Sequence, residues 1–133
     1  MSIAPTRPAP AAPRHEHPAR SAFAWWLTAL SGAALLVLAT VHMVANHFVV
    51  ERVGGLRSYR QVLEYVSDPV IFTVEWLFLL VVTVHAMLGV RGVLADLDPS
   101  PRAQRWIDTV LLVVGGATLG YGSVLLWTLA SRA

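Results

Sequence analysis

Four ionisable side chains lie inside long apolar stretches of the sequence: His42, Glu75, His85 and Arg91. An ionisable group at membrane depth is costly, so residues of this kind are expected to bind a partner group or to take part in chemistry. A neutral histidine can do so by ligating a metal through a ring nitrogen. The chain has no cysteine, which excludes disulfides, iron–sulfur ligation and thiolate-bound zinc or haem. Electron-transfer chemistry would therefore depend on histidine.

His85 shares one helical face with Gly89, Gly92 and Asp96. At about 100° per residue, all three lie within about 40° of the direction of His85. Along this face, a histidine that could ligate a metal lies within the membrane, two positions without side chains follow, and a carboxylate lies near the membrane surface. Two glycines beside a histidine leave a flat slot of the kind that a porphyrin ring needs. The alternative is that the glycines only allow close helix packing, while His85 bonds a carbonyl of a neighbouring helix.

The composition of the chain indicates what surrounds these residues. Of 133 residues, 56% are hydrophobic and 14% are charged, and a soluble domain of this size could not bury so much apolar surface. Three apolar runs each exceed the length of about 20 residues that crosses a bilayer core of about 30 Å. We therefore predict an all-α membrane protein of three transmembrane helices, over residues 22–48, 69–95 and 101–130.

Two of the predicted helices have a clear first residue. Each begins with a capping side chain and then a proline at the first helical position: Asp68 and Pro69 in the second helix, Ser100 and Pro101 in the third. The turn between the second and third helices is short, so these helices are predicted to be antiparallel neighbours.

Two polar segments flank the first predicted helix. Residues 1–21 are rich in Pro, Ala and Arg and are predicted to be a disordered tail. A signal peptide is the alternative, but the apolar run that follows is too long for one. Residues 51–67 are polar, yet Leu63 and Val66 share a helical face with earlier apolar residues. This pattern predicts a short helix that lies in the headgroup region of the bilayer.

The positive charges of the chain are all arginines. Six lie in the tail and at the junction of the second and third helices, and four lie on the other side, so the N-terminus is predicted to be cytoplasmic. The arginines are scattered among helix ends and not gathered on one face. We interpret them as anchors to membrane lipid, and we expect no nucleic-acid partner.

Two parts of the sequence resemble a known family: the string His85-Ala-Met-Leu-Gly-Val-Arg-Gly-Val-Leu-Ala-Asp96, and Ser31-Gly32 followed by His42. They are similar to the small haem b-binding membrane anchors of succinate dehydrogenase (succinate:quinone oxidoreductase, complex II). The resemblance implies that His85 is an axial ligand of haem b and that Asp96 lies by the quinone site. It covers residues 28–97; the third helix matches only as a hydrophobic span.

Two positions depart from the pattern of this family. Many such anchors have an arginine where this chain has Ala29, and ubiquinone-reducing relatives have a tyrosine where it has Leu97. The partner subunit is therefore expected to supply more of the quinone site, and the type of quinone is left open.

His42 is placed farther from the inner surface of the membrane than His85. At 1.5 Å per residue, the two lie about 25 Å and about 14 Å from the inner interface, an offset of about 10 Å. One upright haem between them is not expected. Given the resemblance, we expect two stacked haems, each with one ligand from this chain and one from a partner anchor subunit. The alternative is that His42 is an interhelical histidine bonded within the protein.

The remaining candidates have less specific roles. Gly89, Arg91 and Ser31 are expected to bind the cofactor, Arg91 through haem propionates, although membrane anchoring is its other interpretation. Glu75 is expected either to carry protons to an outer haem or quinone or to bond a neighbouring helix. His47 is interpreted as an interfacial residue. No catalytic residue is predicted.

Residues 22–133 are thus expected to form the membrane anchor of an oxidoreductase, in a bacterial or archaeal cytoplasmic membrane. The resemblance implies three partners: a flavoprotein subunit, an iron–sulfur subunit and a second hydrophobic anchor subunit. The chain would tether them and support electron transfer to quinone without catalysing a reaction itself. The alternatives are a haem-free structural anchor and a small dihaem cytochrome b of another membrane oxidoreductase.

Overall fold

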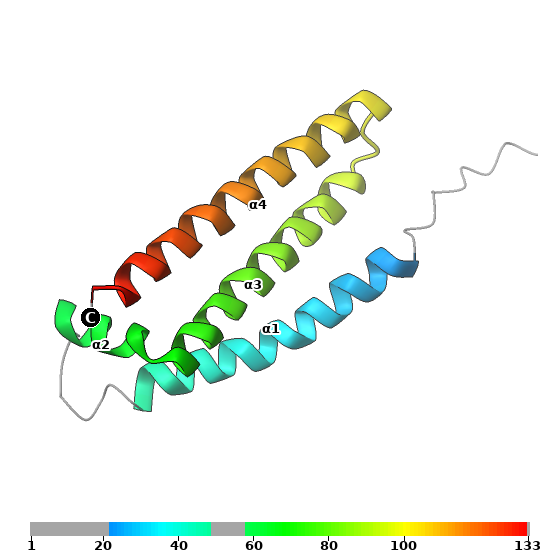
Figure 1. Cartoon of the computed structure of the whole chain (residues 1–133). Helices are drawn as coiled ribbons and strands as arrows, with labels where there is room; N and C mark the ends of the chain where they lie inside the picture. Colours follow the sequence, from blue (N-terminus) through cyan, green and yellow to red (C-terminus); the bar gives the residue numbers. More distant parts are fainter. Residues whose placement is uncertain (1–21, 49–57, 133) are drawn as a thin grey trace, which may run out of the picture.

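The computed structural model describes residues 22–48 and 58–132. Its helices are α1 (Ala22–Phe48), α2 (Tyr59–Ser67), α3 (Pro69–Ala95) and α4 (Pro101–Ala130), and the described residues contain no strand (Figure 1). α1, α3 and α4 are each long and apolar enough to cross a membrane. The predicted all-α membrane fold, with a short helix between the first two long ones, is confirmed. The expected tail over residues 1–21 lies outside the described residues.

The helix starts follow from the capping residues. The Asp68 carboxylate accepts hydrogen bonds from the backbone N–H groups of Val70 and Ile71 at 2.8 and 3.1 Å. At α4, the Ser100 hydroxyl accepts from the backbone N–H of Ala103 at 3.3 Å. Pro69 and Pro101 follow these caps and have no N–H that would need a partner. Each long helix therefore begins where its side chains satisfy the free amide groups of the first turn.

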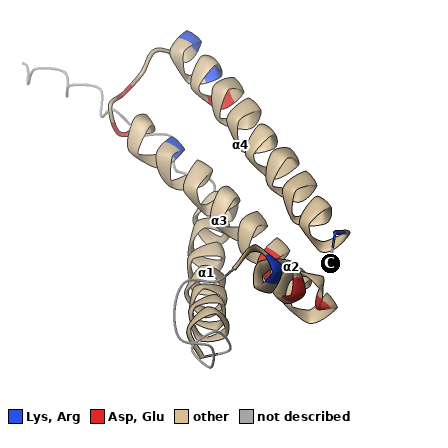
Figure 2. Cartoon of the chain, turned by 90° about the vertical axis from the view of Figure 1, so that its left-hand side faces the viewer, with Lys and Arg blue, Asp and Glu red and all other residues tan. Residues whose placement is uncertain are grey.

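α3 is the central helix, with α1 packed on one side and α4 on the other. In the described part of the chain α1 and α4 are not packed together, and Figure 2 shows α4 diverging from α1. α3 and α4 run antiparallel as predicted, and α2 packs against both of them. The Arg, Asp and Glu residues lie near the helix ends and on α2, which leaves the middle of each long helix uncharged (Figure 2).

Small residues allow α3 and α4 to approach closely. A Cβ atom added to Gly115 would lie 3.1 Å from Met87 Cγ, and one added to Gly122 would lie 2.6 Å from Leu79 Cδ2. Trp76 also donates its indole N–H to the Ser123 hydroxyl at 3.1 Å. These residues pack within the chain, so only part of the small-residue surface of α4 remains open to another helix.

The rest of that surface points away from the chain. Added Cβ atoms at Gly116 and Gly120 would meet nothing within 4 Å. Large apolar side chains of the long helices are similarly uncovered; Phe23, Leu36 and Leu112 are 75%, 73% and 77% exposed. Among the described residues only Leu63 and Val66, both on α2, are buried hydrophobic side chains. The apolar surface is therefore available to lipid or to other subunits.

Candidate functional site

His85 of α3 lies against α1. Its Nδ1 is 3.1 Å from the Ser31 hydroxyl, and Ser31 itself donates to the Thr28 carbonyl at 3.0 Å. A Cβ added to Gly32 would lie only 3.2 Å from His85 Cε1, so the glycine makes room for the ring. Among residues 22–48 and 58–132, His85 Nε2 takes no hydrogen-bond partner. The ring is thus held through one nitrogen, while the other keeps its bonding capacity.

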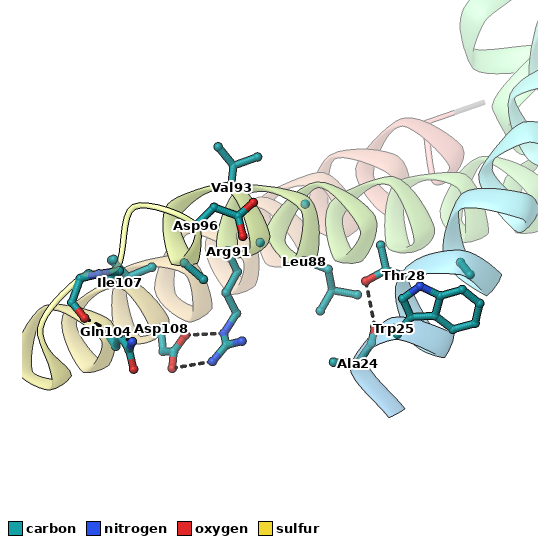
Figure 3. Close-up of a pocket in the computed structure, with 15 residues that line it drawn as sticks. Ala24, Trp25, Thr28, Leu88, Arg91, Val93, Asp96, Gln104, Ile107 and Asp108 are labelled. Carbon is teal, nitrogen blue, oxygen red and sulfur yellow. Dashed lines mark hydrogen bonds and ion pairs between the residues drawn. The ribbon is translucent and has the colours of Figure 1, made fainter. Parts of the chain in front are cut away.

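A cavity of about 760 Å³ opens between the start of α1, the end of α3 and the start of α4 (Figure 3). Gly89, Gly92 and Asp96 line it, whereas His85 lies one helical turn from it. A Cβ at Gly89 would meet nothing within 4 Å, as the predicted flat slot requires. The volume falls in the range of cofactor and ligand sites, about 300–1,000 Å³.

Arg91 and Asp108 form an ion pair between α3 and α4 at this cavity. The guanidinium donates from Nε to Asp108 Oδ1 at 2.6 Å and from Nη2 to Oδ2 at 3.3 Å (Figure 3). Both side chains are about half exposed. Two parallel contacts fix the guanidinium in one orientation. Asp108 was not predicted as the partner of Arg91, because no helical spacing relates residues on different helices.

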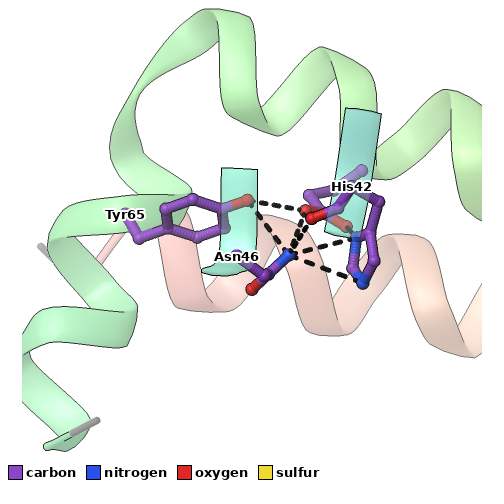
Figure 4. Close-up of polar contacts among 4 residues, drawn as sticks. His42, Asn46 and Tyr65 are labelled. Atoms are coloured by element: carbon purple, nitrogen blue, oxygen red, sulfur yellow. Dashed lines mark hydrogen bonds and ion pairs between the residues drawn. The ribbon is translucent and has the colours of Figure 1, made fainter. Parts of the chain in front are cut away.

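His42 belongs to a second polar group, at the opposite end of the long helices. Its Nδ1 is 2.7 Å from Glu75 Oε2, and Glu75 Oε1 accepts from the Tyr65 hydroxyl at 2.9 Å. The Asn46 amide donates to the Tyr65 oxygen at 3.3 Å and to the His42 carbonyl at 2.8 Å (Figure 4). Phe78 stacks on the His42 ring with 4.8 Å between centroids. We call His42, Asn46, Tyr65 and Glu75 the His42 cluster.

In the His42 cluster, Glu75 makes the bond to a neighbouring helix that was one of its two predicted roles. Glu75 bonds neighbouring helices, α1 through His42 and α2 through Tyr65. The Asn46 amide nitrogen also lies 3.5 Å from His42 Nε2, so both ring nitrogens have contacts. Tyr65 and Asn46 had not been identified as site residues. The four-residue spacing from His42 on one helical face was a signal for Asn46, whereas no local spacing indicated Tyr65, which lies on α2.

The structure separates the candidates into two groups. Gly89, Arg91 and Asp96 line the cavity, with His85 and Ser31 one turn away; His42 and Glu75 lie at the other end. His42 pairs with Glu75, which precedes His85 by ten residues on α3. The two histidines are therefore separated by about 15 Å along the helix axis, more than the expected offset of about 10 Å. His47 is exposed and contacts Phe48 edge-on. In the described part of the chain, no three His, Asp or Glu side chains are grouped to hold a metal ion.

Comparison with known proteins agrees with the predicted family of membrane anchors. The family described as succinate dehydrogenase/fumarate reductase transmembrane subunit matches residues 6–129. A succinate dehydrogenase hydrophobic membrane anchor subunit of Archaeoglobus fulgidus is 27% identical over 106 residues, which cover 80% of this chain and 88% of that protein. One of Thermoplasma acidophilum is 26% identical over 97 residues, covering 73% and 77%. This chain therefore belongs to the succinate dehydrogenase/fumarate reductase transmembrane subunit family, as a multi-pass membrane anchor that has partner subunits.

Proposed function

We propose that this chain is a haem b-binding membrane anchor of a succinate:quinone oxidoreductase, with His85 as an axial ligand. One observation carries the proposal: His85 is bonded through Nδ1 to Ser31, and its Nε2 has no partner among the described residues. A histidine that ligates a metal usually donates a hydrogen bond from its other ring nitrogen to an oxygen acceptor, and this bond fixes the orientation of the ring. His85 has the Ser31 hydroxyl oxygen at that position and lies one turn from a cavity with open space at Gly89.

The residues around the cavity fit a flat, partly charged group. Gly89 and Gly92 leave the wall of α3 without side chains. Arg91 lies at the edge of the cavity, where its guanidinium would bind the haem propionates in addition to Asp108. Bound haem would supply one-electron transfer between an iron–sulfur subunit and quinone. Asp96 lines the same cavity at the end of α3, and we assign it to the quinone side of the site.

A second haem at His42 is the further part of the proposal. In its favour, the Glu75 carboxylate at Nδ1 is the usual partner of a ligating histidine. For His42 to bind iron through Nε2, the Asn46 amide must lose its 3.5 Å contact with Nε2. The amide can keep its hydrogen bond to the His42 carbonyl. The separation of the two histidines means that each haem would take its second ligand from another anchor subunit.

We assign a flavoprotein subunit, an iron–sulfur subunit and a second hydrophobic anchor as partners of the chain. The exposed apolar surface and the open Gly116 and Gly120 on α4 support the second anchor, because small residues let transmembrane helices approach closely. The Asp96 end of α3 would face the iron–sulfur subunit on the cytoplasmic side, together with the N-terminus.

Haem counting on the purified complex tests the function. The pyridine haemochrome assay should find haem b in the wild type and lose the His85-dependent haem in His85→Ala, while His47→Ala, an exposed control, retains it. If the complex is active and colourless, the chain is a haem-free anchor and the proposal is wrong. Two haems per complex, with one lost in His42→Ala, would support the second site; a single haem that survives His42→Ala would leave His42 as an interhelical histidine.

A further inference from the structure

We propose that Ser31 is a positioning residue that sets the tautomer of His85, so that the lone pair of Nε2 is free to bind iron. This inference rests on the proposed function. Ser31 lies 3.1 Å from His85 Nδ1, and its role would be to hold the ring in one tautomer and one orientation.

The number of hydrogen bonds decides between the two tautomers. The Ser31 oxygen is 3.0 Å from the Thr28 carbonyl and 3.1 Å from His85 Nδ1, and its single proton can serve only one of them well. If the proton goes to Thr28, His85 carries hydrogen on Nδ1 and donates to Ser31, which makes two hydrogen bonds. If it goes to His85 Nδ1, only one bond forms, and the hydrogen on Nε2 has no acceptor in the described part of the chain.

Burial makes this difference count. His85 is only partly exposed and lies in a helix able to span a membrane, and a donor without a partner in such surroundings costs about 1–3 kcal/mol. The Nδ1–H tautomer is therefore favoured, and it leaves Nε2 as a bare acceptor. An acceptor nitrogen on a neutral imidazole is the form that coordinates a metal.

Gly32 fixes the orientation of the same ring. His85 Cε1 and Nδ1 lie 3.2 and 3.7 Å from the position of a Cβ on Gly32, so the edge of the imidazole rests on the backbone of α1. Ser31 and Gly32 together seat the ring, one by a hydrogen bond and the other by leaving space. A flip of the ring would break the bond to Ser31.

The variant Ser31→Ala in the purified complex tests the role. Loss of the acceptor should weaken haem retention about 10- to 100-fold, the usual effect of removing an outer-shell partner of a ligand. In the haem that remains, the midpoint potential should rise, because a histidine without an acceptor donates less charge to ferric iron. The electron paramagnetic resonance signal of the ferric haem should shift as well. Ser31→Thr, which keeps the hydroxyl, should restore all three measurements.

Thr83→Ala is the matched control. Thr83 is 6% exposed and donates its hydroxyl to the Leu79 carbonyl of its own helix, so this variant also removes one buried hydroxyl from the same membrane region. It should leave the potential and the resonance signal unchanged. If Ser31→Ala does not accumulate, Ser31→Cys gives the same readout, since a thiol is similar in size but a weak acceptor.

The outcomes separate the two proposals. If Ser31→Ala or Ser31→Cys retains haem with wild-type potential and resonance signal, the positioning role is wrong while haem binding stands. If Thr83→Ala shifts the potential as much as Ser31→Ala, the effect is general and the positioning role is also wrong. If the wild-type complex contains no haem, the proposed function itself fails.

Discussion

Tyr65 of α2 donates its hydroxyl to the Glu75 carboxylate of α3 at 2.9 Å, and the other oxygen of that carboxylate is bonded to His42 of α1. One side chain therefore joins three helices at the end of the molecule where α2 lies. Since Glu75 is only 12% exposed, its two contacts are protected from water and contribute more than surface hydrogen bonds would.

Removal of the Tyr65 hydroxyl should loosen α2. Tyr65→Phe removes a hydrogen-bond donor from one oxygen of the largely buried Glu75 carboxylate. We expect the free energy of unfolding to fall by about 1–3 kcal/mol. Thermal unfolding of the purified complex and protease cleavage between α1 and α3 would measure it. Tyr59→Phe, on the same helix but 61% exposed, is the control and should behave as wild type. Equal stability of the two variants would contradict the role of Tyr65.

The Arg91–Asp108 pair should contribute little to stability in spite of its two contacts. Both groups are about half exposed, and exposed ion pairs are usually worth about 0–1 kcal/mol. A double-mutant cycle with Arg91→Gln and Asp108→Asn would measure the coupling. We expect Arg91→Gln to affect cofactor or quinone binding more than folding. A coupling well above 1 kcal/mol would instead make the pair a structural bond between α3 and α4.

A larger side chain at Gly122 should disturb the packing of α3 on α4. The position of a Cβ there lies 2.6 Å from Leu79 Cδ2, and overpacking of a tight contact costs about 1–3 kcal/mol. Gly122→Val should therefore lower the unfolding temperature.

Gly120→Val is the matched variant on the open face of α4, where an added Cβ meets nothing within 4 Å. It should leave the packing of α3 on α4 intact. If Gly120→Val prevents assembly while the chain still inserts stably, the second anchor subunit lies on this face. If both variants are equally harmless, the close contact between α3 and α4 is not important for stability.

A large side chain at Gly89 should fill the cavity without unfolding the chain. Because a Cβ at Gly89 points into open space, Gly89→Leu should fit sterically and lower the haem content of the complex. Ala86→Leu, at an exposed position of α3 that does not line the cavity, is the control. Haemochrome assays on both variants would check this. Normal haem content in Gly89→Leu would place the haem away from the cavity.

The helices were predictable because their signals are local. Apolar runs, together with Asp68, Pro69, Ser100 and Pro101, mark α3 and α4 without reference to other parts of the chain. The face of His85 was also predictable, since helical spacing alone puts Gly89, Gly92 and Asp96 beside it.

The contacts between helices could not be predicted in this way. A helix that is apolar on all sides gives no indication of which face meets its neighbour. The bond from Ser31 to His85 depends on the rotation of α1 against α3, and the bond from Arg91 to Asp108 depends on the geometry of a turn. Asn46 and Tyr65 were missed because their contacts with each other and with Glu75 depend on how α1, α2 and α3 pack together.

Two polar contacts between α1 and α3, one at each histidine, also determine how the two helices align along the membrane normal. Ser31 meets His85, and eleven residues later on α1, about 16 Å along its axis, His42 meets Glu75. Lipid gives apolar helices no hydrophobic preference for one vertical alignment over another. A slide of α1 by one turn, about 5.4 Å, would break both contacts at once. These contacts thus select a single alignment of α1 against α3 and keep the two histidines at a constant separation.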